Sequence, residues 1–134
     1  MTPAQLQDIL DQNFAEWVRA LDMRVISANP DLTVVDMQNG PALRRVGGIV
    51  SGQALAALAD TAMVLVAIAN AGEMRLFATT DLHTQFLRPG VAPVIRCNAR
   101  IIRAGKALVF VRADMTDGED GKPVATATAS FFAT

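Results

Sequence analysis

Residues 50–63, VSGQALAALADTAM, continue in apolar residues as far as Ala71 and predict one long helix with a single charge. Ser51 is a preferred N-cap residue, because its hydroxyl oxygen can accept a backbone N–H of the first turn, and Gly72 can adopt the left-handed conformation that ends a helix. Between these two residues only Asp60 is ionisable. A helix that is apolar on all sides is buried in a core or a membrane, where an isolated carboxylate is costly unless it has partners or a function. The helix is therefore predicted to be the centre of the fold, with Asp60 as its candidate functional group.

Alternating apolar and polar residues predict strands on both sides of this helix. The predicted strands are residues 23–27, 32–37, 75–87, 94–103, 107–115 and 124–132. Before them, residues 2–5 form a capping box that begins an amphipathic helix, whose apolar positions recur from Leu6 to Leu21. Helix, two strands, long helix and four strands in a meander predict an α+β domain that spans residues 1–134, with one antiparallel sheet curved around the buried helix. This arrangement resembles the hotdog fold with an extra N-terminal helix.

Composition excludes several classes of function. Twelve basic and thirteen acidic residues give a net charge of −1, so the basic surface expected of a nucleic-acid-binding protein is absent. Cys97 is the only cysteine, which excludes an intrachain disulfide and favours a reducing, cytoplasmic setting. The N-terminus lacks the pattern of a signal peptide, and a charge in the middle of the long helix costs ~2.5–3.5 kcal/mol in a membrane. Because no residues have metal-ligand spacing either, we expect a protein that uses no metal, cofactor or membrane.

The motif Ser51-Gly52-Gln53, six residues, Asp60-Thr61-Ala62 resembles the helix-start motif of hotdog thioesterases of the PaaI (phenylacetate-pathway) type, which is His-Gly-Gly, six residues, Asp-Thr-Ala. Two later segments fit the same family, namely Thr79-Thr80-Asp81-Leu82 with Gln85-Phe86-Leu87-Arg88-Pro89, and the turn Arg103-Ala104-Gly105-Lys106. The resemblance covers the chain from Gly40 to its end. Ser51 stands in the place of the family's histidine and would replace part of the hydrogen bond that the histidine donates.

The resemblance implies an acyl-CoA thioesterase with Asp60 as general base or nucleophile. The family's serine or threonine on the following strand is matched by Thr79, with Thr80 as the neighbouring possibility. The residues suit these roles, because thioester hydrolysis needs a base or nucleophile, an oriented water and donors aimed at the developing oxyanion. Thr79 would orient the water, and the backbone N–H groups of Gly52 and Gln53 would form the oxyanion hole at the positive end of the helix dipole.

Helix geometry separates Ser51 from Asp60. Nine residues at ~1.5 Å and ~100° per residue place the two side chains ~13 Å apart on opposite faces. They cannot contact one carbonyl group, so a site that uses both must pair Asp60 of one subunit with the helix start of another. We therefore expect an obligate symmetric homodimer with two shared sites, and the resemblance implies that such dimers often pair into homotetramers.

The apolar strand faces predict a slot for a small, medium-chain or aryl acyl group, carried by coenzyme A as part of the substrate. Arg88, Arg103 and Lys106 lie at predicted strand ends, where they could bind the phosphates of coenzyme A. For each of them taken singly, a solvated surface charge or an ion-pair partner is the favoured interpretation. Residues 44–48 form a basic, glycine-containing loop directly before the long helix, and a ligand could be met there as well.

Two other functions stay open on the sequence alone. A hotdog hydratase or dehydratase uses a histidine with a carboxylate, and the motif histidine is replaced here by Ser51. A non-catalytic acyl-CoA-binding protein would keep the fold, with Ser51 marking a lost activity. His83 is the only histidine and is predicted at the surface or an interface, whereas Cys97 is predicted to be a small core residue.

Overall fold

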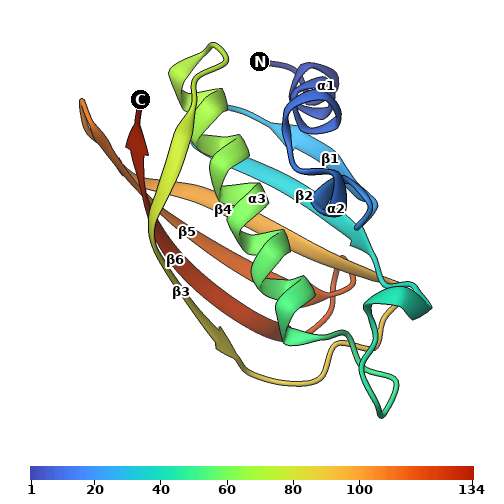
Figure 1. Ribbon diagram of the computed structural model, residues 1–134. Coiled ribbons are helices and arrows are strands. Elements are labelled where there is room, and N and C mark those ends of the chain that lie inside the picture. Colours follow the sequence, from blue (N-terminus) through green and yellow to red (C-terminus); the bar gives the residue numbers. More distant parts are fainter.

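The computed structural model describes residues 1–134 and contains a six-stranded antiparallel sheet curved around helix α3 (Gly52–Ala71) (Figure 1). The strands are β1 (Met23–Ala28), β2 (Leu32–Gln38), β3 (Phe77–Phe86), β4 (Val94–Ala104), β5 (Leu108–Asp117) and β6 (Pro123–Ala133). The remaining helices are α1 (Pro3–Asn13), α2 (Glu16–Arg19) and the 3-10 turn η1 (Pro41–Leu43). The predicted hotdog architecture with its N-terminal helix is confirmed.

Helix α3 begins and ends where its sequence predicts. Ser51 has extended backbone angles and its hydroxyl accepts the N–H of Ala54 at 3.2 Å, while Gly72 ends the helix with φ of 76°. By length and composition α3 could span a membrane, and 67% of its most apolar window is buried inside the protein. It packs with the sheet into one continuous cluster of 30 buried apolar residues. The apolar character of α3 is therefore that of a core helix.

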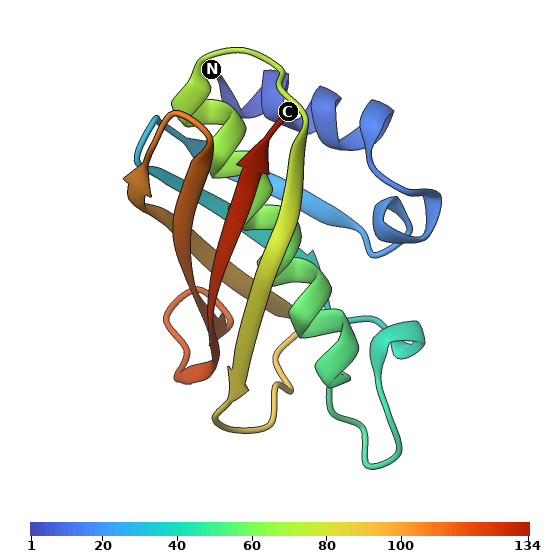
Figure 2. The same cartoon turned by 60° about the vertical axis from the view of Figure 1, so that its left-hand side comes forward.

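The order of the strands differs from the predicted meander. Strand β3 pairs with β6 and not with β4, while β4 pairs with the free side of β2. Only β4, β5 and β6 form a meander. After α3 the chain forms β3 at the β6 edge of the sheet, and it then crosses to the other side, where β4 extends the β1–β2 hairpin. Consecutive strands of a chain are not always neighbours in a sheet. As a result β3 is an edge strand that runs beside α3 (Figure 2).

A β-bulge in β3 decides which side chains face α3. Strict alternation predicts that Thr79, Asp81 and His83 share one face, but Thr79 pairs with Phe131 and Asp81 with Ser130, so Thr80 is the extra residue. The alternation reverses at this point, which turns Thr79 toward α3 and Asp81 and His83 toward the opposite face of the sheet. The face prediction was therefore wrong after residue 79.

The N-terminal helix is interrupted. Its capping box forms as predicted, with Thr2 and Gln5 exchanging two hydrogen bonds of 2.9 and 3.1 Å. However, α1 ends at Asn13, Phe14 and Ala15 have extended ψ angles of 157° and 145°, and α2 follows as a single short turn. The helix predicted as far as Leu21 is therefore two helices joined by a sharp break.

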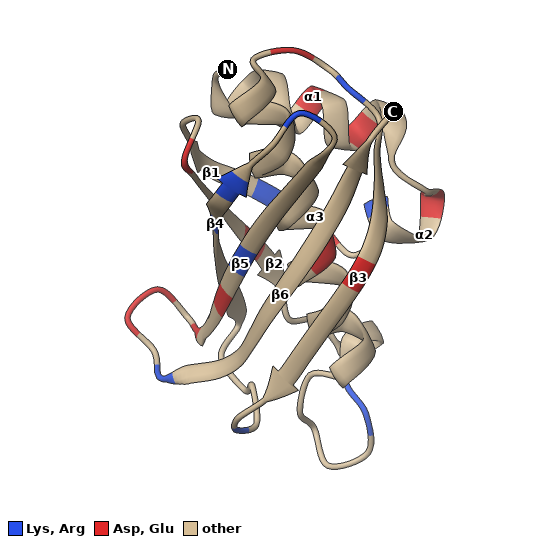
Figure 3. Cartoon of the chain, turned by 90° about the vertical axis from the view of Figure 1, so that its left-hand side faces the viewer, with Lys and Arg blue, Asp and Glu red and all other residues tan.

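Charged residues of both signs are scattered over the strands and loops, and no patch of one sign is visible on the face shown in Figure 3. Arg96 forms a bidentate salt bridge with Asp36, with hydrogen bonds of 2.8 and 2.9 Å, and Arg112 forms a salt bridge of 3.3 Å with Asp114. In these two pairs, a basic and an acidic side chain on the sheet neutralise one another.

Candidate active site

The carboxylate of Asp60 meets a hydroxyl from the edge strand. Helix α3 directs Asp60 toward the start of β3, where Thr79 Oγ1 donates a hydrogen bond of 3.0 Å to Asp60 Oδ1. The neighbouring Thr80 is engaged elsewhere, since its hydroxyl contacts the Ser130 carbonyl at 3.0 Å and the Ser130 hydroxyl at 2.8 Å. Of the two predicted threonines, the structure brings only Thr79 to the carboxylate, and the bulge at Thr80 is the cause.

Burial changes the proton affinity of Asp60. Removal of water from the half-buried carboxyl raises its pKa above the ordinary value of 3.8, and the hydrogen bond from Thr79 opposes this only in part. A carboxylate with a raised pKa is a stronger base than one in water. Asp60 Oδ2 has no donor within the chain, so this oxygen is free to take a proton from a bound water.

The raised pKa predicts a pH-dependent effect on stability. Because folding raises the pKa of Asp60, its protonated form favours the folded state. This contribution to the free energy of unfolding is fully present below pH 3.8 and is lost as pH rises through the higher folded-state pKa. Asparagine stays neutral throughout. We expect Asp60→Asn to match the wild type at the acid end and to become the more stable protein above the folded-state pKa. Urea unfolding free energies of both proteins from pH 3 to pH 7 test this, and a difference of constant size would contradict it.

An apolar cavity of about 300 Å³ lies beside the carboxylate. Its lining includes Asp60, Val64 and Ile68, which follow one another along one face of α3, together with Phe77 and Thr79 from the start of β3. Seven of its eleven lining residues are hydrophobic. The cavity therefore suits an acyl chain or ring whose reacting end reaches Asp60.

A second half-site lies at the start of α3. The backbone N–H groups of Gly52 and Gln53 have no acceptor within the chain, as expected for the first positions of a helix. A Cβ added at Gly52 would lie 3.3 Å from the end of the Phe86 ring. Glycine thus keeps the two donors accessible in a narrow space, and an oxygen that develops negative charge would be stabilised there.

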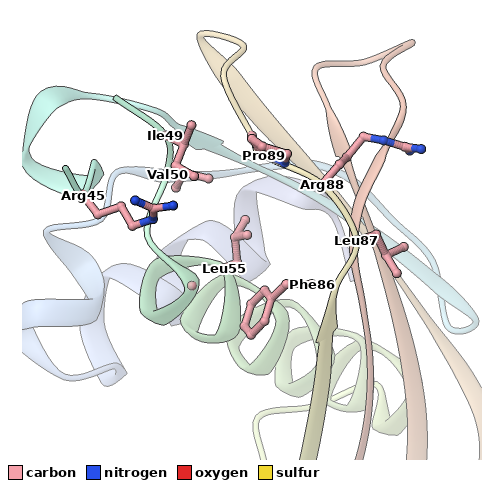
Figure 4. A pocket seen from close by; sticks show the side chains of 10 residues that line it. Arg45, Ile49, Val50, Leu55, Phe86, Leu87, Arg88 and Pro89 are labelled. Atoms are coloured by element: carbon pink, nitrogen blue, oxygen red, sulfur yellow. The ribbon is translucent and has the colours of Figure 1, made fainter. Parts of the chain in front are cut away.

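A cavity of about 320 Å³ adjoins this helix start, and it brings in an arginine that the sequence did not single out. In Figure 4, Arg45 reaches across the cavity toward Leu55, whereas the predicted Arg88, which also lines this cavity, extends its guanidinium away from Arg45. The guanidinium of Arg88 donates to the Pro123 carbonyl at 2.7 Å. Arg45 belongs to the predicted basic loop of residues 44–48, and that loop was the only signal for it.

The structure does not bring all predicted residues together within one chain. The cavity beside Asp60 and the cavity beside Gly52 share no lining residue. Arg103 and Lys106 belong to the β4–β5 hairpin, whose end lies near the start of β3, whereas Arg88 follows the end of β3. The ten residues from Phe77 to Phe86 span ~30 Å in an extended strand. The predicted separation of the two half-sites is therefore observed, and the predicted phosphate-binding cations are divided between the two ends of the sheet.

The remaining chemically reactive side chains lie outside these two half-sites. His83 is exposed and lines a small depression with Arg112 on the outer face of the sheet. Cys97 is fully buried, and burial, together with the charge of Asp114, raises the pKa of its thiol. No group of three or more His, Cys, Asp or Glu side chains is placed to hold a metal ion. The prediction that Cys97 is a core residue is confirmed, and His83 is at the surface as predicted.

Comparisons with known proteins agree with this geometry. Residues 47–124 match the thioesterase superfamily. An esterase-named protein of Thermoplasma volcanium, TV1331, is 31% identical over 87 residues, which are 65% of this chain and 63% of that protein. The chain thus spans less than two thirds of the length of this curated relative.

Two solved structures have the same fold. The PaaI protein of E. coli, from the phenylacetic acid degradation operon, is 21% identical with a TM-score of 0.84, over 98% of this chain and 93% of PaaI. A Streptococcus pneumoniae protein described as a hypothetical thioesterase, solved with coenzyme A, is 20% identical with a TM-score of 0.77, over 84% and 86% of the two chains. The matched residues 47–124 include α3 with Asp60, and β3 with Thr79. The chain belongs to the thioesterase superfamily and has the hotdog fold of PaaI.

Proposed function

We propose that the protein is an acyl-CoA thioesterase in which Asp60 is the general base or nucleophile. The observation that carries this proposal is the pairing of Asp60 with Thr79 beside an apolar cavity, with the pKa of the carboxyl raised by burial. Membership of the thioesterase superfamily supports the reaction class. The esterase name of the Thermoplasma relative and the coenzyme A in the Streptococcus structure support the same class of substrate.

In the water-mediated route, Asp60 Oδ2 accepts a proton from water while the water oxygen attacks the thioester carbonyl carbon. The Thr79 hydroxyl, which donates to Asp60 Oδ1, can accept the other water hydrogen and so orient the attack. The carbonyl oxygen becomes an oxyanion. When the carbon–sulfur bond breaks, the thiolate of coenzyme A leaves and takes up a proton, and the acyl group is released as a carboxylic acid. Direct attack by Asp60 would give an anhydride that water then cleaves to the same products.

The oxyanion is proposed to bind at the start of α3. The N–H groups of Gly52 and Gln53 are free to donate to it, and the helix dipole adds a favourable potential. The Ser51 hydroxyl accepts the N–H of Ala54, but its own hydrogen has no acceptor in the chain. Ser51 can therefore supply the donor that the family motif takes from histidine, while it also caps the helix.

Two copies of the chain are needed to join the half-sites. Strand β3 leaves one edge of the sheet unpaired, with Leu82, Phe86 and Leu87 exposed at 38%, 54% and 53%. An apolar, unpaired edge favours pairing with another strand. A two-fold axis at the middle of β3 would pair two such edges antiparallel and place Thr79 of each chain beside Phe86 and Gly52 of the other. We propose this homodimer, and pairing of dimers into tetramers stays part of the prediction.

The same two-fold symmetry would bring together, at each end of the paired β3 strands, the basic side chains that are far apart within one chain. The β4–β5 hairpin with Arg103 and Lys106 of one chain would approach the helix start and Arg45 of the other. A cluster of that kind suits the phosphates of coenzyme A, because guanidinium groups match phosphate oxygens in geometry. Arg88 is the weakest member of the predicted set, since its guanidinium is held by the Pro123 carbonyl.

The other functions have less support. A hydratase needs a histidine beside the carboxylate, and His83 faces the side of the sheet away from Asp60. A non-catalytic binding protein has no need for a half-buried carboxylate paired with a hydroxyl, so the Asp60–Thr79 pair favours catalysis.

A reducing cytoplasmic location and a single domain complete the proposal. The unpaired, buried Cys97 supports the first, and one continuous core supports the second.

Release of free thiol from short, medium, long and aryl acyl-CoAs tests the proposed function. The wild type is expected to release thiol from at least one class and to run as a dimer or a dimer of dimers in light scattering. Binding of acyl-CoA without thiol release across the whole panel would instead support the non-catalytic protein. A monomer that turns over substrate would overturn the shared site.

A further inference from the structure

The break between α1 and α2 lies against the cavity beside Asp60. Asn13, Phe14 and Ala15, the residues at which the predicted continuous helix stops, all line this cavity. The sequence contains no proline or glycine there, and alanine is the strongest helix former. Ala15 nevertheless has a ψ of 145°. A conflict of this kind between local preference and structure is typical of functional sites.

Two hydrogen bonds within the segment and the packing of Phe14 against the core hold the break in place. The Asn13 side chain donates to the Ile9 carbonyl at 3.1 Å and satisfies one carbonyl of the last turn of α1. Across the break, Arg19 donates to the Asp11 carbonyl at 3.3 Å. Phe14 is half-buried and packs against the core, while also lining the cavity. The extended backbone at Phe14 therefore places its ring at the cavity and not along the surface of a longer helix.

The cavity has a floor and two walls. Asp60, Val64 and Ile68 recur every four residues and extend ~12 Å along one face of α3. Figure 1 shows β3 on one side of α3 and the α1–α2 break on the other. Phe77 lines the first wall, with the Arg75 guanidinium 5.8 Å from the centre of its ring, and Phe14 lines the second. The width available to a chain lying on this floor is thus set by Phe14 and Phe77.

We infer that Phe14 is a specificity-determining residue that limits the size of the acyl group bound beside Asp60. This inference rests on the proposed thioesterase function. Seven of the eleven lining residues are hydrophobic and Arg75 is the only cation among them, so the acyl group is an apolar chain or ring that reaches from Asp60 toward Ile68. Groups too wide or too long for the space left by Phe14 are excluded, because a close-packed apolar pocket discriminates by ~10-fold or more for each methylene that does not fit.

The test compares Phe14→Ala and Phe14→Trp over a series of saturated acyl-CoAs from four to twelve carbons. The ratio of kcat/KM for long over short chains is expected to rise about tenfold in Phe14→Ala and to fall about tenfold in Phe14→Trp. Trp17→Ala is the matched control, since Trp17 is an aromatic residue of the same segment that is 64% exposed and does not line the cavity. Its ratio is expected to match the wild type.

A second measurement separates this inference from the proposed function. Calorimetric binding of free fatty acids of the same lengths reports on the cavity without any hydrolysis, and the preferred length should shift in the same directions. Thiol release with an unchanged length profile in both Phe14 variants would overturn the inference and leave the function standing. A shifted binding profile without thiol release would support the cavity and overturn the function. An absence of both binding and thiol release would overturn the two together.

Discussion

Asp60→Asn is expected to lower kcat for thiol release by about 10²–10⁴-fold, the range typical for loss of a general base. The amide oxygen can still accept the hydrogen bond from Thr79, so the side chain keeps its place while it loses the ability to take a proton. The fold should be intact, and the thermal midpoint at neutral pH should be equal or higher because a half-buried charge has been removed. Initial rates at saturating acyl-CoA measure the change.

The matched control for this prediction is Asp81→Asn. Asp81 carries the same charge on the same edge strand, only two residues beyond Thr79, but it faces the outer side of the sheet. Its replacement should leave kcat within about twofold of the wild type, because Asp81 lines neither cavity of the candidate site and asparagine keeps its shape at the β3 edge. If Asp60→Asn retained more than a tenth of the wild-type rate, or if both variants lost activity equally, Asp60 would not be the base or nucleophile.

Gly52→Pro should lower kcat by about 10²–10³-fold, the effect of losing one donor from an oxyanion hole. Proline is well tolerated at the first position of a helix, where the N–H has no partner within the helix. Ser51 before it has φ of −68° and ψ of 147°, the conformation that a residue preceding proline prefers. The substitution thus removes the proposed N–H donor and leaves α3 in place, which circular dichroism can verify.

Gly52→Ala distinguishes loss of the donor from loss of space. Alanine keeps the N–H, and its Cβ lies 3.3 Å from the end of the Phe86 ring, a flexible side chain that can shift by a few tenths of an ångström. Gly52→Ala should therefore retain most of the activity that Gly52→Pro loses. Equal losses in the two variants would indicate a steric role for Gly52 and argue against the oxyanion hole.

The parts of the fold that follow from local chemistry could be predicted from the sequence. Ser51 and Gly72 delimit α3 because capping depends on neighbouring residues alone. The capping box at Thr2 and the six strands follow from equally local patterns. Asp60 stands out because a single carboxylate in an apolar helix is conspicuous without any structure, and helix geometry alone separates it from Ser51.

The rest depends on contacts between distant segments. The bulge at Thr80 depends on the register with Ser130, and it alone explains why Thr79 and not Thr80 meets Asp60. The helix break at Phe14 has no local signal, since its neighbour Ala15 favours a continuous helix. The position of β3 at the edge of the sheet likewise follows from the pairing of β4 with β2. Each of these three features positions residues of the candidate site, whereas the buried core depends on them less.

The central claim is that each site takes Asp60 from one chain and the helix start from the other. Heterodimers of Asp60→Asn and Gly52→Pro, co-expressed with two different affinity tags and purified through both, test it directly. In a shared arrangement one site of the heterodimer holds both substitutions and the other holds neither, so thiol release should recover to about half of the wild-type rate per dimer. If the heterodimer were as inactive as the two parent homodimers, each site would lie within a single chain and the account would be wrong.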